Sequence, residues 1–111
     1  MSTMKLCNCT PHILNIIGTD GIEIVLPPSG LVPRLSVDRV HSGEFAGVTL
    51  WRPTLSVTTA LPEPVEGTIF VVSAIVAEAN PSRKDLASPG EVIRNEQGQP
   101  IGCRGLSIYW R

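Results

Sequence analysis

Six side chains that are suited to bind an anion lie close to glycine-rich and proline-rich turns. They are Arg34, Arg83, Lys84, Arg94, Arg104 and Trp51. Arginine binds phosphate or carboxylate through two parallel N–H donors, and an aromatic ring can stack on a base. If the fold brings them together, they form a pocket for a small anionic, nucleotide-like ligand. In the alternative interpretation they are solvated or pair with nearby acids, namely Glu44, Asp85, Glu91 and Glu96.

A second set of residues has the chemistry of a zinc site. Cys7, Cys9, Cys103 and His12 are ligands of the kind that zinc prefers. Structural zinc sites usually carry cysteine pairs with two residues between them, whereas a single residue separates Cys7 from Cys9. We therefore favour three small, buried, apolar side chains and predict neither a metal nor a cofactor.

Catalytic machinery is not evident in the sequence. His12 and His41 are the only histidines, and neither lies in a nucleophile elbow or a metal-binding pair. We expect His12 to bond to the turn after Pro11 and His41 to face solvent. No glycine-rich dinucleotide fingerprint and no phosphate-binding loop is present. The sequence therefore predicts a protein that is not an enzyme.

The element that must position these residues is an apolar segment, residues 68–79, bracketed by prolines. Residues 68–72 are β-branched or aromatic without alternation, a pattern typical of a strand covered on both faces. Ser73 can cap a short helix over residues 74–79, and the helix should end before Pro81. This segment is the predicted core.

The other predicted elements are short strands separated by turns. In chain order they are a hairpin of residues 13–17 and 22–26, an edge strand 31–37 containing Pro33, a connecting loop 38–47, strands 48–51 and 55–59 separated by Arg52 and Pro53, an exposed loop 82–90, a second hairpin of residues 92–94 and 100–102, and a last strand 106–110. The predicted fold class is mainly β (α+β), an antiparallel sandwich or partly open barrel of seven to eight short strands with one short helix. Residues 1–111 are expected to form a single domain.

The composition limits the partners. The net charge is −1, which does not provide the basic surface needed for duplex nucleic acid or an anionic membrane. Only 17% of the residues are charged and 42% are hydrophobic, so we expect a homo-oligomer that buries part of this surface. No targeting signal or membrane-spanning run is evident, and an odd number of cysteines suits a reducing compartment. We expect a cytoplasmic location.

Several motifs extend over nearly the whole chain. They are Asn-Cys-Thr-Pro-His at residues 8–12, the Pro-Ser-Gly segment 28–34, Leu-Pro-Glu-Pro-Val-Glu-Gly-Thr at 61–68, and Ile-Gly-Cys-Arg-Gly-Leu at 101–106. This set resembles a family of short phage and prophage proteins, mostly of unknown function, that carry N-L-T-P-H, P-S-G-x-x-A-R, L-P-x-P-x-E-G-T and I-G-C-R-G-L. The chain departs from that pattern at Cys9, where leucine is usual, and at Pro33, where alanine is usual.

The resemblance implies a phage-encoded protein of a bacterial host cell. Small phage proteins of this kind are similar in outline to counter-defence sponges that sequester nucleotide second messengers of bacterial immunity. The alternative is a protein-binding inhibitor, similar to an anti-CRISPR protein, or a phage accessory protein, with no small-molecule ligand. A mimic of nucleic acid would more often be strongly acidic, and this chain is not.

Overall fold

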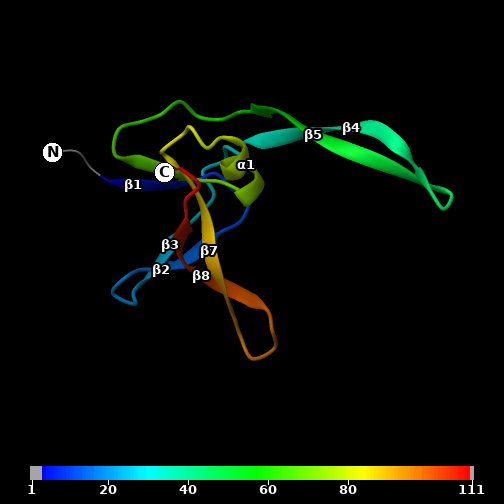
Figure 1. The fold of residues 1–111 in the computed structure, drawn as a ribbon. Coiled ribbons are helices and arrows are strands. Elements are labelled where there is room, and N and C mark those ends of the chain that lie inside the picture. Colours follow the sequence, from blue (N-terminus) through cyan, green and yellow to red (C-terminus); the bar gives the residue numbers. More distant parts are fainter. Residues whose placement is uncertain (1–3, 111) are drawn as a thin grey trace.

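Eight strands and one helix appear in the computed structural model, which describes residues 4–110 except for the side chains of residues 37 and 55–57 (Figure 1). In chain order they are β1 (Lys5–Asn8), β2 (Leu14–Ile17), β3 (Glu23–Leu26), β4 (Arg34–Phe45), β5 (Val48–Thr59), β6 (Thr68–Val71), α1 (Ala74–Ala79), β7 (Leu86–Arg94) and β8 (Pro100–Ser107). The predicted fold class is confirmed, because the chain is mainly β with one short helix.

Six of the strands form one curved sheet in the order β1-β6-β7-β8-β2-β3, and β4 and β5 form a second sheet of their own. The six-stranded sheet is mixed rather than antiparallel. β6 is parallel to both β1 and β7, and β2 is parallel to β8, whereas the β2–β3 and β7–β8 pairs are antiparallel. The parallel pairs follow from the connections. β6 is joined to β7 through α1, and a crossover of this kind leads to a parallel neighbour whereas a tight hairpin cannot.

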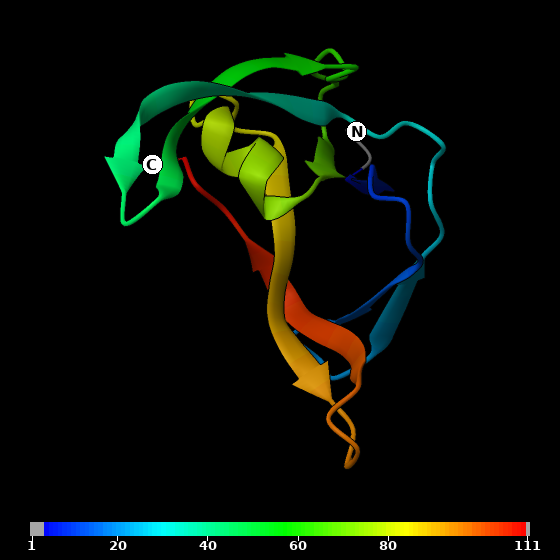
Figure 2. The same ribbon diagram turned by 90° about the vertical axis from the view of Figure 1, so that its right-hand side faces the viewer.

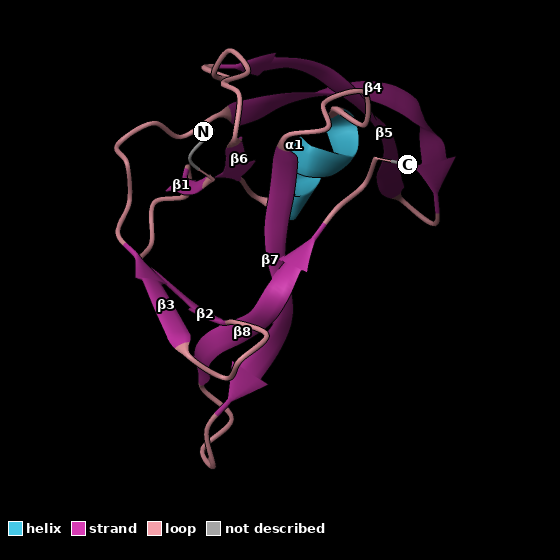
Figure 3. Cartoon of the chain, turned by 90° about the vertical axis from the view of Figure 1, so that its left-hand side faces the viewer, coloured by secondary structure: helices cyan, strands magenta, loops and turns pink. Residues whose placement is uncertain are grey.

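The two outer strands of the sheet, β1 and β3, are joined by Asn8 at the end of β1. Its side-chain nitrogen donates to the carbonyl oxygen of Leu26, at 2.9 Å, and to that of His12, at 2.7 Å. Its side-chain oxygen accepts from the backbone N–H and the hydroxyl of Thr10, and its backbone carbonyl accepts from Ser29 N–H. Asn8 is only 2% exposed. These bonds nearly close the sheet into a barrel (Figure 3).

The core lies where β6, α1 and β7 meet, as the apolar segment predicted. Phe70, Val71 and Val72 are buried, and Val76 of α1 packs with Leu86 of β7 in the same cluster. The predicted strand and helix are both confirmed. The predicted serine cap is wrong in one respect, because the Ser73 side chain makes no capping hydrogen bond and only its carbonyl accepts from Ala77 N–H.

The predictions for residues 38–59 are confirmed in part, because the strands expected over residues 48–51 and 55–59 both lie within β5. The expected loop over residues 38–47 and the expected break at Arg52 and Pro53 are wrong, because β4 and β5 are twelve-residue strands that pair along their length with two register shifts. The chain reverses only at Ala46 and Gly47, whose φ angles of 50° and 79° match the two-residue turn that suits hairpins. The polar residues of this segment reflect exposure to solvent rather than a loop, because the β4–β5 ribbon extends away from the rest of the molecule as an arm (Figure 1).

The expected exposed loop over residues 82–90 is confirmed for residues 82–85 and wrong for residues 86–90, because β7 begins at Leu86 and its residues 86–88 are buried between β6 and β8. Gly90 makes this strand possible, since a Cβ there would lie 2.3 Å from the carbonyl oxygen of Arg104 on β8. The hairpin predicted around residues 92–102 is confirmed. The last predicted strand is not separate. β8 ends at Ser107, and Tyr109 beyond it shares a hydrogen bond of 3.1 Å with buried Ser88.

Within residues 4–110, the only helix is α1, and it is far too short to cross a bilayer.

The barrel closure can be tested with Asn8→Ala. This change removes the donor to the partly buried carbonyl group of Leu26, one of two donors to that of His12, and the acceptor of buried Thr10, so we expect the free energy of unfolding to fall by about 2–4 kcal/mol. Asn15→Ala is the matched control, because that amide makes one exposed bond of 3.3 Å and its loss should lower the free energy by less than about 1 kcal/mol. Urea unfolding measures both. Equal losses in the two variants would contradict a closure that depends on Asn8.

Candidate functional site

The amino ends of three parallel strands, β1, β6 and β7, lie next to one another. Lys5 of β1 is opposite Thr68 of β6, and the Lys5 N–H donates to the carbonyl oxygen of Gly67 at 2.7 Å. Before β7, the carbonyl oxygen of Asp85 accepts from Phe70 N–H at 2.8 Å. The proline-rich segment before β6 and the loop before β7 are therefore fixed at the same edge of the sheet.

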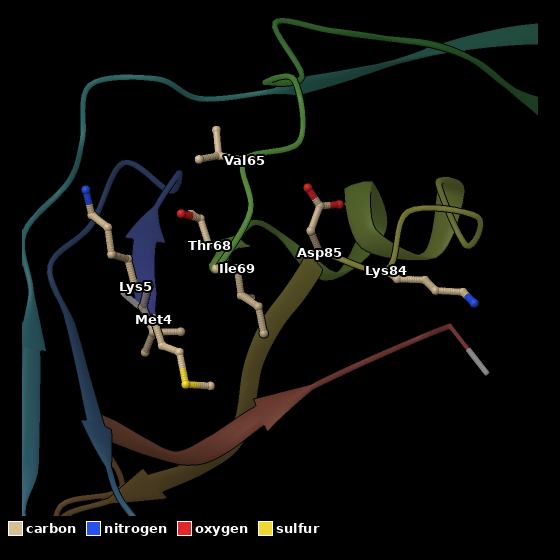
Figure 4. Close-up of a pocket in the computed structure, with 9 residues that line it drawn as sticks. Met4, Lys5, Val65, Thr68, Ile69, Lys84 and Asp85 are labelled. Atoms are coloured by element: carbon tan, nitrogen blue, oxygen red, sulfur yellow. The ribbon is translucent and has the colours of Figure 1, made fainter. Parts of the chain in front are cut away.

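A cavity of about 440 Å³ opens at this edge. Its lining is Met4, Lys5, Leu6, Val65, Gly67, Thr68, Ile69, Lys84 and Asp85. Figure 4 shows the side chains of Met4 and Ile69 between the two lysines, whose amino groups lie at opposite sides and point away from each other. The arrangement is an apolar surface with a mobile cation at each side, which suits a ligand that has both an apolar part and an anionic part.

The carboxylate of Asp85 is already occupied by Arg83. The guanidinium donates through Nε to one carboxylate oxygen at 2.8 Å and through one terminal nitrogen to the other at 2.7 Å. The same terminal nitrogen donates to the carbonyl oxygen of Pro62 at 2.8 Å. The hydrogen bonds from Arg83 lower the pKa of Asp85, and the carboxylate in turn raises the pKa of Arg83. The pair fixes the 61–67 segment and largely cancels the negative charge beside the cavity.

The six residues predicted to bind a ligand do not surround one cavity. Arg34 and Trp51 are on the arm, while Arg94 and Arg104 are on β7 and β8. Arg94 donates to the carbonyl oxygen of Gly98, within its own hairpin, at 2.8 Å, and Trp51 makes an edge-to-face contact with His41 at 5.8 Å between ring centres.

Arg83 and Lys84 are adjacent in the chain and border a shallower hollow of about 300 Å³ with Asp85. Lys84 alone of the six also lines the larger cavity. Among the six residues, Arg83 fits the alternative interpretation, because it pairs with a neighbouring acid, Asp85.

Lys5 was missed by the sequence analysis. Its partner across the cavity, Lys84, lies 79 positions later in the chain, and the two are brought to the same edge by the parallel pairing of β1 with β6 and of β6 with β7. A single lysine before a short strand carries no local signal. Only the strand order makes it part of a site.

The cysteines are placed as small apolar side chains. Cys9 and Cys103 are buried, as predicted, and Cys7 is partly buried. The sulfur atoms of Cys7 and Cys9 lie 3.9 Å apart, and burial together with Cys7 raises the pKa of Cys9 to about 11. At neutral pH the Cys9 thiol is therefore protonated and a poor nucleophile. Over the described part of the chain, no group of three or more histidine, cysteine, aspartate or glutamate side chains is arranged to hold a metal.

The two histidines lie apart. His12 contributes its backbone to the Asn8 network and has an exposed side chain, in line with the expectation that it bonds to its own turn. His41 is exposed on the arm, where its ring meets Trp51.

No protein-family profile matches the chain, and neither a curated protein sequence nor a solved structure matches it.

The ion pair beside the cavity can be tested with Asp85→Asn. Because the folded pKa of Asp85 is lowered, the pair stabilises the fold above the ordinary carboxyl pKa of about 3.9, and this contribution is lost as the pH falls through the lowered value. The variant should lose about 1–2 kcal/mol of unfolding free energy at neutral pH, and the deficit should shrink below about pH 3.9. Urea unfolding over a pH series measures it.

Glu66→Gln is the control for that series, because Glu66 is an exposed carboxylate in the same proline-rich segment. It should change the unfolding free energy by less than about 0.5 kcal/mol at every pH. A deficit in Asp85→Asn that is the same at neutral and acidic pH would show that the loss is not electrostatic.

Proposed function

We propose that this protein is a non-enzymatic binding protein that captures a small anionic ligand, such as a nucleotide-type signal, in the cavity at the amino ends of β1, β6 and β7. The observation that carries the proposal is the combination of an apolar surface with Lys5 and Lys84 at its two sides (Figure 4). This assigns the ligand to a site that includes one of the six predicted residues, Lys84, together with Lys5.

The charge balance at the cavity favours an anion. Lys5 and Lys84 supply two ammonium groups, and Asp85, the only acidic side chain among the described residues of the lining, is held by two hydrogen bonds from Arg83. A carboxylate that is already paired repels an incoming anion less than a free one does. Each lysine has an exposed, flexible stem, so its ammonium group can swing toward a bound phosphate.

The size and lining favour a small molecule with an apolar or aromatic part. Ligand sites usually enclose about 300–1,000 Å³ and are mainly apolar with a few polar groups, and this cavity has 440 Å³. Met4, Leu6, Val65 and Ile69 offer a surface for a flat ring, and Thr68 offers one hydroxyl for a hydrogen bond. A nucleotide combines such a ring with such an anion.

Sequestration, rather than turnover, suits the groups that line the cavity. Within residues 4–110 the lining has neither histidine nor cysteine, and its carboxylate, Asp85, is held in an ion pair. The resemblance to short phage proteins suggests that the ligand is a second messenger of bacterial immunity and that the protein acts in the cytoplasm of the host cell. The alternative is an inhibitor or accessory protein that binds another protein.

The proposal is tested by thermal unfolding in the presence of cyclic nucleotides and ADP-ribose-type nucleotides. A ligand that binds only the folded state at 100 times its Kd stabilises the protein by about 2.7 kcal/mol, so Tm should rise by several degrees and depend on concentration. Lys5→Gln and Lys84→Gln should each weaken binding by about tenfold, because each removes one charge-assisted contact with the phosphate. Calorimetric titration measures that change.

Arg34→Gln and Arg104→Gln are the matched controls, since both remove an exposed cation that lies outside the cavity lining. They should leave the affinity unchanged. Loss of binding in the arginine variants, with the lysine variants unaffected, would move the site away from this cavity. If no nucleotide raises Tm, the proposal is wrong and binding to a protein is the remaining function.

A further inference from the structure

The two faces of the β4–β5 arm differ in chemistry. Side chains of paired residues lie on the same face, and successive residues alternate between faces except at a bulge, such as the register shift between His41 and Gly43 on β4. The pairs Val40–Arg52, Gly43–Leu50 and Phe45–Val48 therefore share one face, and Arg39–Pro53, His41–Trp51 and Glu44–Thr49 share the other. Four large apolar side chains thus gather on the first face, which we call the apolar arm face: Val40, Phe45, Val48 and Leu50.

Nothing in the described part of the chain covers this face. Phe45 is 74% exposed, Val48 61%, Val40 53% and Leu50 46%. The arm is attached to the body at its base, where Asn80 donates to the hydroxyl of Thr58 at 3.0 Å and Leu35 packs against the core. Figure 2 shows the base of the arm crossing above α1. An isolated two-stranded ribbon is at best marginally stable in water, so the outer half of the arm needs a covering layer.

The whole chain exposes more surface than a monomer of its mass should. The solvent-accessible area is 7903 Å², whereas a monomer of 11.9 kDa is expected to expose about 5,900 Å². The radius of gyration is 17.0 Å against about 13 Å expected for a compact domain of 111 residues. The excess of about 2,000 Å² is larger than the roughly 800 Å² that each partner buries in a stable interface.

We propose that the apolar arm face packs against the apolar arm face of a second copy of this chain, around a two-fold axis. A two-fold axis brings the same patch of both copies together, so four apolar side chains from each arm cover the four of the other. The net charge of −1 opposes this only weakly. This contact supplies the second apolar layer that each arm lacks.

Pro53 disfavours pairing of a further strand along the free edge of β5. Proline has no backbone N–H, and strands that carry one are poor templates for a further strand on their free edge. The opposite face of the arm carries Arg39 and Glu44 and one large apolar side chain, Trp51, whose ring contacts His41, so it is the more polar of the two faces. The apolar arm face is therefore the surface that the second copy covers.

The test is the mass of the protein in solution, measured by light scattering after size-exclusion chromatography and by sedimentation velocity. The wild-type chain should have at least twice the mass of one copy. Leu50→Lys places a charge on the apolar arm face, and the mass should fall to that of one chain. Thr49→Lys is the matched control, because it places the same charge one residue earlier, on the opposite face and across from Glu44. It should keep the wild-type mass.

A second variant, Val48→Lys, guards against misfolding of the first, and circular dichroism should show the wild-type strand content in all three. A wild-type mass of one chain, or equal dissociation by Leu50→Lys and Thr49→Lys, would overturn the proposal. None of these residues lines the cavity at β1, β6 and β7, so Leu50→Lys should bind a nucleotide as the wild type does. Failure of the oligomer and failure of the ligand are thus separate results.

Discussion

The side-chain amide of Asn8 is the contact on which the rest of the body depends. A six-stranded sheet with free edges at β1 and β3 would present unpaired backbone groups to other chains, and the bonds of Asn8 join those edges instead. The same amide holds the carbonyl of His12, so the turn that leads into β2 is fixed as well. Because Asn8 is buried, each of these bonds is stronger than it would be in water. The polar motif at residues 8–12 therefore has a structural explanation.

Closure of the sheet in turn determines what lies at its edge. With β1 fixed, its parallel pairing to β6 places Lys5 beside Thr68, and the pairing of β6 to β7 places the loop of Lys84 at the same end. The Arg83–Asp85 pair adds a second link, since Arg83 also binds the carbonyl of Pro62. Two short segments that carry no recognisable motif thus line the same cavity. The geometry of the candidate site is a consequence of topology rather than of a local motif.

Local patterns predicted the elements that short-range physics determines. The apolar run of residues 68–79 specified β6 and α1, and the Asp20–Gly21 pair, with Gly21 at a φ of 82°, specified the β2–β3 hairpin. Local patterns could not predict which strands pair when they are far apart in the sequence. Polar residues of β4 were interpreted as a loop because the usual strand signal assumes one buried face, which the outer arm lacks. Residues 86–88 were interpreted as a loop because residues 82–90 have too little apolar periodicity for a regular element, although Gly90 is needed for the close approach to β8.

The division of apolar residues between core and surface explains why the chain is so elongated. Its buried core centres on β6, α1 and β7, while Phe45, Val48 and Leu50 are at least 46% exposed on a ribbon far from that core. They lie too far out to join the core in this arrangement, since twelve residues of extended strand span about 40 Å. An apolar face on the outer part of the arm adds no packing stability within a single chain. In the proposed dimer the second copy covers this face, and the low content of charged residues favours that contact.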